Sequence, residues 1–83
     1  MIENKIKDYR DDRNMTQAEL AKMVGVRRET IYNLEHGHYN PSLALAWSIA
    51  QVFDVSIEDI FTVRFAPDAV GKITRAGGKA NGN

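Results

Sequence analysis

Residues 16–37 read TQAELAKMVGVRRETIYNLEHG, and this stretch decides the fold. Thr16 is a helix N-cap residue, and Glu19 stands where its side chain can bond back to the cap in a capping box. Gly25 supplies the left-handed backbone conformation that closes a helix. A further helix is predicted over about residues 28–36, because the glycine that follows would stop it. The stretch therefore predicts two short helices separated by a tight turn.

Two helices joined in this way form a helix-turn-helix pattern. At about 100° per residue, Ile31 and Leu34 of the second helix lie toward the core. The outward face then carries side chains with polar tips: Glu29, Tyr32, Asn33 and His36, flanked by Arg28 and Thr30. A helix with so narrow an apolar seam is expected to protrude, and it fits a DNA major groove about 12 Å wide. Arg28 can pair with guanine, Asn33 with adenine, and Glu29 can accept from a cytosine amino group.

Apolar residues recur at helical spacing elsewhere in the first 61 residues. A first helix is expected from about Glu3 to Arg13. Ser42 is placed to cap a fourth helix, and Ser56 is placed to cap a short fifth one. The first helix is expected to turn Ile2, Ile6, Tyr9 and Arg10 inward. The fifth is expected to contain the apolar residues Ile57, Ile60 and Phe61.

The chain changes character after the fifth helix. Residues 62–65 alternate with a period of two and predict a strand, on which residues 72–75 can pair back as a hairpin. Residues 76–83 contain no apolar residue larger than alanine and are expected to be disordered. We therefore predict an all-α domain of five helices over residues 1–61, a strand or hairpin extension over residues 62–75, and a tail.

Composition excludes several classes of function. The 83 residues include no cysteine, which excludes a disulfide scaffold, a thiolate zinc finger and a cysteine nucleophile, and favours the reducing cytoplasm. No apolar run approaches the roughly 18–20 residues that span a bilayer, so we expect no membrane partner. A Gly-rich phosphate loop and a Ser-His-Asp set are both missing from the sequence. We expect neither an enzyme nor a cofactor nor a small-molecule substrate.

The formal net charge of zero conceals an asymmetry along the chain. Residues 1–61 hold seven Lys/Arg and ten Asp/Glu, whereas residues 62–83 hold four and one. Most of the acidic residues lie outside residues 22–39, which hold Lys22, Arg27, Arg28 and both histidines. A local positive field at the third helix can therefore oppose the acidic average.

The same residues resemble the XRE-type, lambda-repressor-like helix-turn-helix family. The resemblance runs in register from about Ile2 to Phe61, and it is carried by residues 16–21, Val24-Gly25-Val26, Ile31, Leu34-Glu35, Gly37 and residues 40–43. It implies a five-helix DNA-binding domain in which Gln17 bonds a phosphate and backbone amides near residues 36–39 hold another. It also implies an ion pair between Arg10 and Glu35. The base-contacting residues that it implies are Arg27, Arg28, Glu29 and Asn33.

Two positions depart from the family pattern. Arg27 stands where Ser or Thr is common, so the third helix lacks its expected cap, and a cation there opposes the helix dipole. We interpret Arg27 as a DNA contact, because a phosphate or guanine would neutralise it. Glu29 stands where Gln is frequent. It either reads cytosine, pairs with Arg28 or another neighbour, or lowers non-specific affinity.

Three aromatic or imidazole side chains near the end of the third helix have alternative interpretations. His36 and His38 are only two of the three or four ligands that a metal site needs, so we expect loop residues near a DNA phosphate and no metal. Tyr32 is either a contact to a base or thymine methyl group, or a half-buried ring beside the apolar seam.

We expect a cytoplasmic, homodimeric repressor that binds a palindromic operator, because specific affinity normally requires two recognition helices about 34 Å apart. The expected dimer interface comprises Trp47, Ile57, Phe61, Val63 and Phe65. The alternative is an antitoxin or anti-repressor-type module whose main partner is a protein. The acidic excess of residues 1–61 favours that alternative, whereas Arg27 and Arg28 favour DNA.

Overall fold

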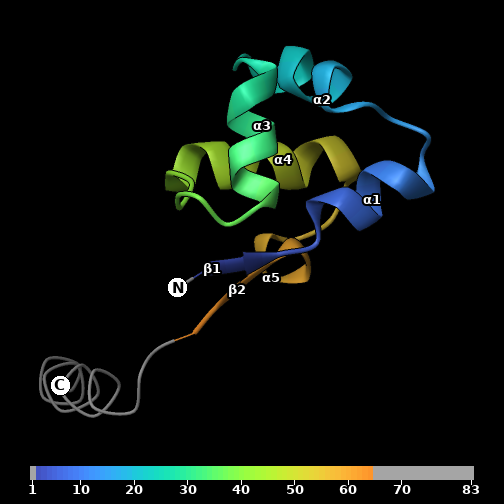
Figure 1. The fold of residues 1–83 in the computed structure, drawn as a ribbon. Helices are drawn as coiled ribbons and strands as arrows, with labels where there is room; N and C mark the ends of the chain where they lie inside the picture. Colours follow the sequence, from blue (N-terminus) through green and yellow to red (C-terminus); the bar gives the residue numbers. More distant parts are fainter. Residues whose placement is uncertain (1, 65–83) are drawn as a thin grey trace, which may run out of the picture.

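A computed structural model describes residues 2–64, which form five helices and two short strands (Figure 1). In chain order these are β1 (Ile2–Asn4), α1 (Ile6–Asp12), α2 (Gln17–Val24), α3 (Arg28–Glu35), α4 (Leu43–Phe53), α5 (Ile57–Ile60) and β2 (Phe61–Val63). The five predicted helices are confirmed. Phe65, the hairpin arm at residues 72–75 and the tail at residues 76–83 lie outside the described residues. Among residues 2–64, no helix has the length and apolar content needed to cross a membrane.

The helices enclose one apolar core to which every helix contributes. Its largest fully buried side chains are Ile6, Leu20, Ile31, Leu34, Ile49, Phe53 and Ile60. α2 packs against both α3 and α4, and α3 lies across α4 in Figure 1. Packing against α2 holds α3 on the core through Ile31 and Leu34, and its other side carries no buried residue.

Local capping residues begin three of the helices where the sequence predicted. The side-chain oxygens of Thr16, Ser42 and Ser56 accept from the backbone N–H groups of α2, α4 and α5. At Thr16 and Ser56 the reciprocal bond from the third helical residue completes a capping box. Gly25 closes α2 at φ 76°, in the left-handed region, as expected.

The expectation of a helix beginning near Glu3 is wrong, because residues 2–4 form a strand. β1 pairs antiparallel with β2, and Ile2 lies opposite Val63 in the register. The backbone N–H of Lys5 donates to the carbonyl of Ile60 at 2.9 Å, which continues the contact between the two ends of the domain. Pairing with β2 therefore overrides the helical spacing of the first apolar residues, and α1 begins only at Ile6.

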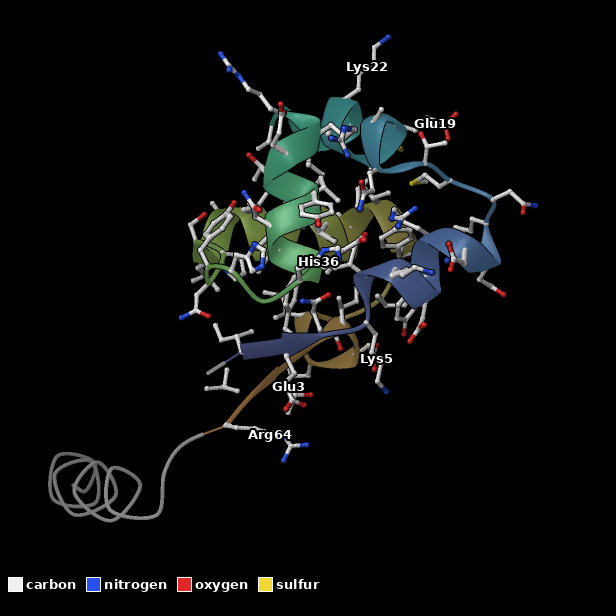
Figure 2. The ribbon with its side chains drawn as sticks, viewed as in Figure 1. Glu3, Lys5, Glu19, Lys22, His36 and Arg64 are labelled. Atoms are coloured by element: carbon white, nitrogen blue, oxygen red, sulfur yellow. The ribbon has the colours of Figure 1, made fainter. Side chains whose placement is uncertain are left out.

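β2 also differs from the predicted strand. It begins at Phe61, where the backbone turns to φ −113° and ψ 135°, so Phe61 follows α5 rather than lying within it. Within the described residues the partner of β2 is β1, not a strand that follows it. An ion pair of 2.9 Å between Arg64 and Glu3 joins the two chain segments beyond the core (Figure 2).

Candidate nucleic-acid interface

α3 exposes the side that the sequence predicted. Ile31 and Leu34 are fully buried beneath it, as expected from their spacing. The residues predicted to contact DNA are exposed or half-buried: Arg27, Arg28, Glu29, Tyr32, His36 and His38 are exposed, and Gln17, Thr30 and Asn33 are half-buried. The arrangement therefore brings all nine to the helix-turn-helix or to the loop that follows it.

The N-terminus of α3 has no side-chain cap. Arg27 occupies the N-cap position with an extended backbone at φ −83° and ψ 156°, and no side-chain hydrogen bond closes the first turn. The absence of a cap, inferred from the residue type, is confirmed. The first N–H groups of α3 and the exposed cation Arg27 thus belong to the same end of the helix, and both favour an anion there.

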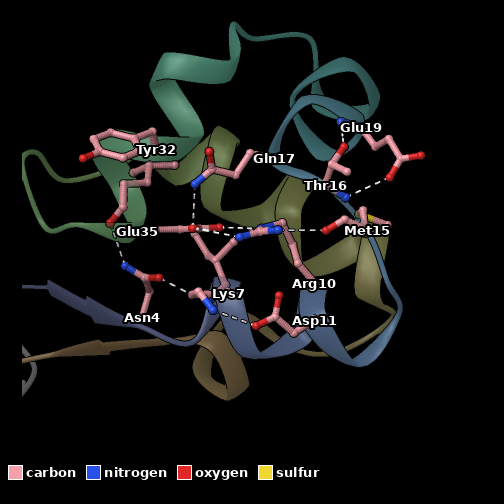
Figure 3. A network of polar contacts seen from close by, with 12 residues as sticks. Asn4, Lys7, Arg10, Asp11, Met15, Thr16, Gln17, Glu19, Tyr32 and Glu35 are labelled. Carbon is pink, nitrogen blue, oxygen red and sulfur yellow. Dashed lines mark hydrogen bonds and ion pairs between the residues drawn. The ribbon is translucent and has the colours of Figure 1, made fainter.

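A buried ion pair joins α1 to the C-terminal turn of α3. Arg10 donates through Nε to Glu35 Oε2 at 2.6 Å and through Nη2 to Glu35 Oε1 at 3.0 Å, which makes the pair bidentate (Figure 3). Arg10 Nη1 donates to the carbonyl of Met15 at 2.8 Å. The hydrogen bond with Glu35 raises the pKa of Arg10 above its ordinary value. The predicted ion pair is confirmed.

Gln17 extends this pair to the exposed surface of α3. Its Nε2 donates to Glu35 Oε1 at 2.9 Å, and its Oε1 accepts from Arg28 Nη1 at 2.9 Å. The resulting series, Arg10–Glu35–Gln17–Arg28, runs from the core to the first residue of α3. These contacts of Gln17 were not predicted from the sequence, because only the packing of α2 on α3 brings the partners together.

Asn4 also supports the end of α3, a role that was not predicted from the sequence. Its Nδ2 donates to the carbonyl of Leu34 at 2.8 Å, and its Oδ1 accepts from the N–H of Ile6 at 3.1 Å. One side chain thus bonds the N–H of the first residue of α1 and a carbonyl near the end of α3. No local signal marks this role, because the two elements are 30 residues apart in the chain.

The end of α3 is closed by a glycine turn that gathers three rings. Gly37 has φ 71°, and its N–H donates to Leu34 while that of His38 donates to Asn33, the two bonds of a Schellman motif. The rings of Tyr32 and His36 stack with centroids 4.0 Å apart. Tyr32 is exposed. Of its two interpretations, the structure therefore favours a ring that can contact a base over a half-buried ring beside the apolar seam.

Charged side chains on the remaining surface form weaker contacts. Lys7 and Asp11 form an exposed i,i+4 pair at 2.8 Å, and their hydrogen bond raises the pKa of Lys7 and lowers that of Asp11.

Glu29 forms no ion pair within residues 2–64, since Arg28 bonds Gln17 instead. In the same part of the chain, no three His, Asp or Glu side chains are grouped so as to hold a metal ion.

A family model described as helix-turn-helix matches residues 6–60. The chain belongs to this family. It is 63% identical over 60 residues to an HTH-type transcriptional regulator of Archaeoglobus fulgidus, a match that covers 72% of this chain and 84% of the relative. The resemblance inferred from the sequence is confirmed: this is a lambda-repressor-like domain of the XRE type, and the family binds DNA.

Solved structures support the same fold. The P22 c2 repressor in complex with a synthetic operator superposes with a TM-score of 0.61 at 26% identity, covering 64% of this chain and 80% of that one. SinR, a master regulator of biofilm formation, in complex with DNA gives a TM-score of 0.59 at 31% identity, covering 64% and 86%. The five-helix helix-turn-helix architecture expected from the sequence is therefore confirmed.

An apolar surface of this helix-turn-helix domain lies on α4, α5 and β2. Trp47 and Val63 are exposed there, Ile57 is half-buried, and together with Leu43 they line a shallow depression. Phe61 also lines the depression but is buried in the core, so it presents little area to a partner. We call the exposed residues Leu43, Trp47 and Val63, together with the half-buried Ile57, the α4–α5 patch.

Proposed function

We propose that this chain is a sequence-specific transcriptional repressor in which α3 reads operator bases in the major groove. The observation that carries the proposal is the division of α3 into two sides. Ile31 and Leu34 are buried, whereas the opposite side presents hydrogen-bonding groups to solvent. Such groups match the donors and acceptors that base pairs display in the major groove.

Arg28 is the residue best placed to read a base. Its guanidinium can offer paired donors to guanine O6 and N7, and the bond from Nη1 to Gln17 restricts its orientation before DNA arrives. This restriction lowers the entropy lost on binding. Glu29 lies one residue further along α3 without an ion partner in residues 2–64, which leaves cytosine reading and lowered non-specific affinity as its two roles.

Phosphate contacts fix the position of α3 without reading sequence. Gln17 keeps one amide hydrogen beyond the one that it donates to Glu35, and this hydrogen is available to a phosphate. The uncapped start of α3 with Arg27 supplies a second contact. The backbone N–H of Tyr39, which follows the Schellman turn, supplies a third, since those of residues 36–38 are bonded to carbonyls of α3.

A homodimer gives this small interface its specificity. Two copies of α3 separated by about 34 Å reach successive major grooves on one side of the duplex, and two-fold symmetry makes the operator palindromic. The α4–α5 patch is the proposed contact between copies, because it lies on elements other than α2 and α3. A symmetric pair would also cover the exposed edge of the β1–β2 sheet. The lack of cysteine fits action in the cytoplasm.

The test is a mobility-shift titration with duplexes enriched by selection and with random duplexes. Arg28→Ala and Asn33→Ala should each weaken binding to the selected duplex by about 1–3 kcal/mol, because each removes a base contact. Lys5→Ala is the control, since Lys5 is an exposed cation that directly precedes α1 and is not among the residues predicted to contact DNA; Figure 2 labels it.

The control should bind as the wild type does. If the wild type instead enriches no sequence and binds all duplexes alike, the proposal is wrong. The fold would then serve a protein partner, as in an antitoxin or anti-repressor subunit.

A further inference from the structure

We infer that His38 sets the base preference of Asn33, by holding the side-chain oxygen of Asn33 so that its amide nitrogen faces the DNA. The inference rests on the proposed function, because it requires α3 to face the major groove. It assigns to His38 a positioning role in sequence reading.

The Schellman turn at Gly37 brings the two residues together. The backbone N–H of His38 donates to the carbonyl of Asn33 at 2.8 Å. Nδ1 of the His38 ring also lies 3.2 Å from Oδ1 of Asn33. The two residues are therefore joined through both main chain and side chain, and the left-handed glycine makes this geometry accessible.

Neighbouring rings restrict the His38 ring. The centroid of the Tyr32 ring lies 6.3 Å away in an edge-on arrangement, and that of His36 lies 5.9 Å away. Tyr32 and His36 are themselves stacked, and His36 Nδ1 contacts the carbonyl of Tyr32 at 2.8 Å. His38 is thus the last member of a small ring cluster on the outer side of α3.

The direction of the hydrogen bond follows from the chemistry of the amide. Oδ1 of Asn33 carries no hydrogen and can only accept, so His38 Nδ1 donates. Either the neutral Nδ1–H tautomer or the imidazolium can do this. The two ends of a carboxamide point about 120° apart, so Nδ2 of Asn33, with its two hydrogens, points away from His38.

This orientation changes which base Asn33 favours. A bidentate pair with adenine needs the amide oxygen to accept from the adenine amino group while the nitrogen donates to N7. Because His38 holds the Oδ1 atom of Asn33 toward the loop, Asn33 presents only its two N–H donors to the major groove. Guanine presents two neighbouring acceptors, O6 and N7, in the major groove. We therefore expect Asn33 to select guanine over adenine, in contrast to the adenine preference inferred from its residue type alone.

The experiment is a selection from randomised duplexes with wild type, His38→Ala and His38→Gln. Asn33→Ala identifies the base pair in question, as the position whose preference it removes. At that position the wild type should enrich guanine, and His38→Ala should raise the ratio of adenine to guanine by about tenfold, within the range for one paired base contact. His38→Gln should keep guanine, because its amide can still donate to Oδ1.

Tyr39→Ala is the matched control, because Tyr39 is an exposed ring in the same loop. It should leave the ratio unchanged. A purely structural role for His38 would lower affinity for all duplexes without changing the preference at one position. Enrichment of adenine by the wild type, an unchanged ratio in His38→Ala, or no position lost in Asn33→Ala would overturn the inference. If the wild type enriches no sequence, the proposed function itself has failed and the inference fails with it.

Discussion

Two ion pairs that both begin on α1 differ in burial by a wide margin. The side chains of Arg10 and Glu35 are 9% and 4% exposed, whereas those of Lys7 and Asp11 are 68% and 55% exposed. Solvent screens the exposed pair, and side-chain entropy opposes it, so it contributes little to stability. Removing one partner of the buried pair instead leaves a charge with few other partners in a dry environment.

Glu35→Leu should therefore lower the free energy of unfolding by about 3 kcal/mol, since Arg10 loses two hydrogen bonds and its countercharge. The double variant Arg10→Met/Glu35→Leu should lose less, because it removes both charges. Urea unfolding followed by far-ultraviolet circular dichroism measures both values. Lys7→Ala is the control and should unfold nearly as the wild type does; a Glu35→Leu variant as stable as this control would contradict the argument.

At the scale of elements, the start of α3 lacks a side-chain cap, and a single substitution should supply one and stabilise the domain. The backbone at Arg27 has nearly the same angles as the capping residues Thr16 and Ser56. Arg27→Ser should therefore form a cap without rearrangement and raise the free energy of unfolding by about 1 kcal/mol. Thermal unfolding checks this gain.

The same variant should bind DNA more weakly, and its affinity should depend less steeply on salt concentration, because a phosphate contact is lost. Arg27→Ala separates the two effects, since it loses the contact without gaining a cap. A stabilised Arg27→Ser variant with an unchanged salt slope would show that Arg27 does not contact phosphate.

The end of α4 has a left-handed backbone conformation at a residue that is not glycine. Asp54 has φ 56°, and its N–H donates to Gln51 while that of Val55 donates to Ala50. Asp54→Gly should raise the free energy of unfolding by about 0.5–1 kcal/mol, because glycine adopts this conformation without a steric penalty. Urea unfolding again measures the change. Asp54→Ala should be no more stable than the wild type, and a stabilised alanine variant would point to the carboxylate rather than the backbone.

Features set by neighbouring residues were predictable, whereas features set by distant ones were not. Thr16 and its capping partner lie within one helical turn, and the exposed face of α3 follows from two buried residues of the same helix. β1 could not be predicted, because its register with Val63 depends on the opposite end of the domain. The bonds of Gln17 to Glu35 and Arg28 likewise require α2 and α3 to be packed first.

At the scale of the whole molecule, the proposed dimer depends on where the apolar surface lies. The α4–α5 patch lies on α4, α5 and β2 and not on α3. A second copy can therefore cover the patch while the α3 helix of each copy stays accessible. Interfaces of this kind usually depend on one or two aromatic anchors near their centre. Trp47 is the aromatic residue of the patch, and it is 56% exposed in the single chain.

Trp47→Ser should weaken self-association by at least about tenfold, since it removes the largest apolar side chain from the proposed contact. Sedimentation velocity over a range of concentrations measures this directly. Binding to a full palindrome should fall, while binding to one half-site should not change, because each α3 is intact. Met23→Ser is a matched control: Met23 is 59% exposed but lies on α2, outside the patch. If both variants sediment as the wild type does, the copies do not meet through Trp47, and the spacing of half-sites must be set by another surface.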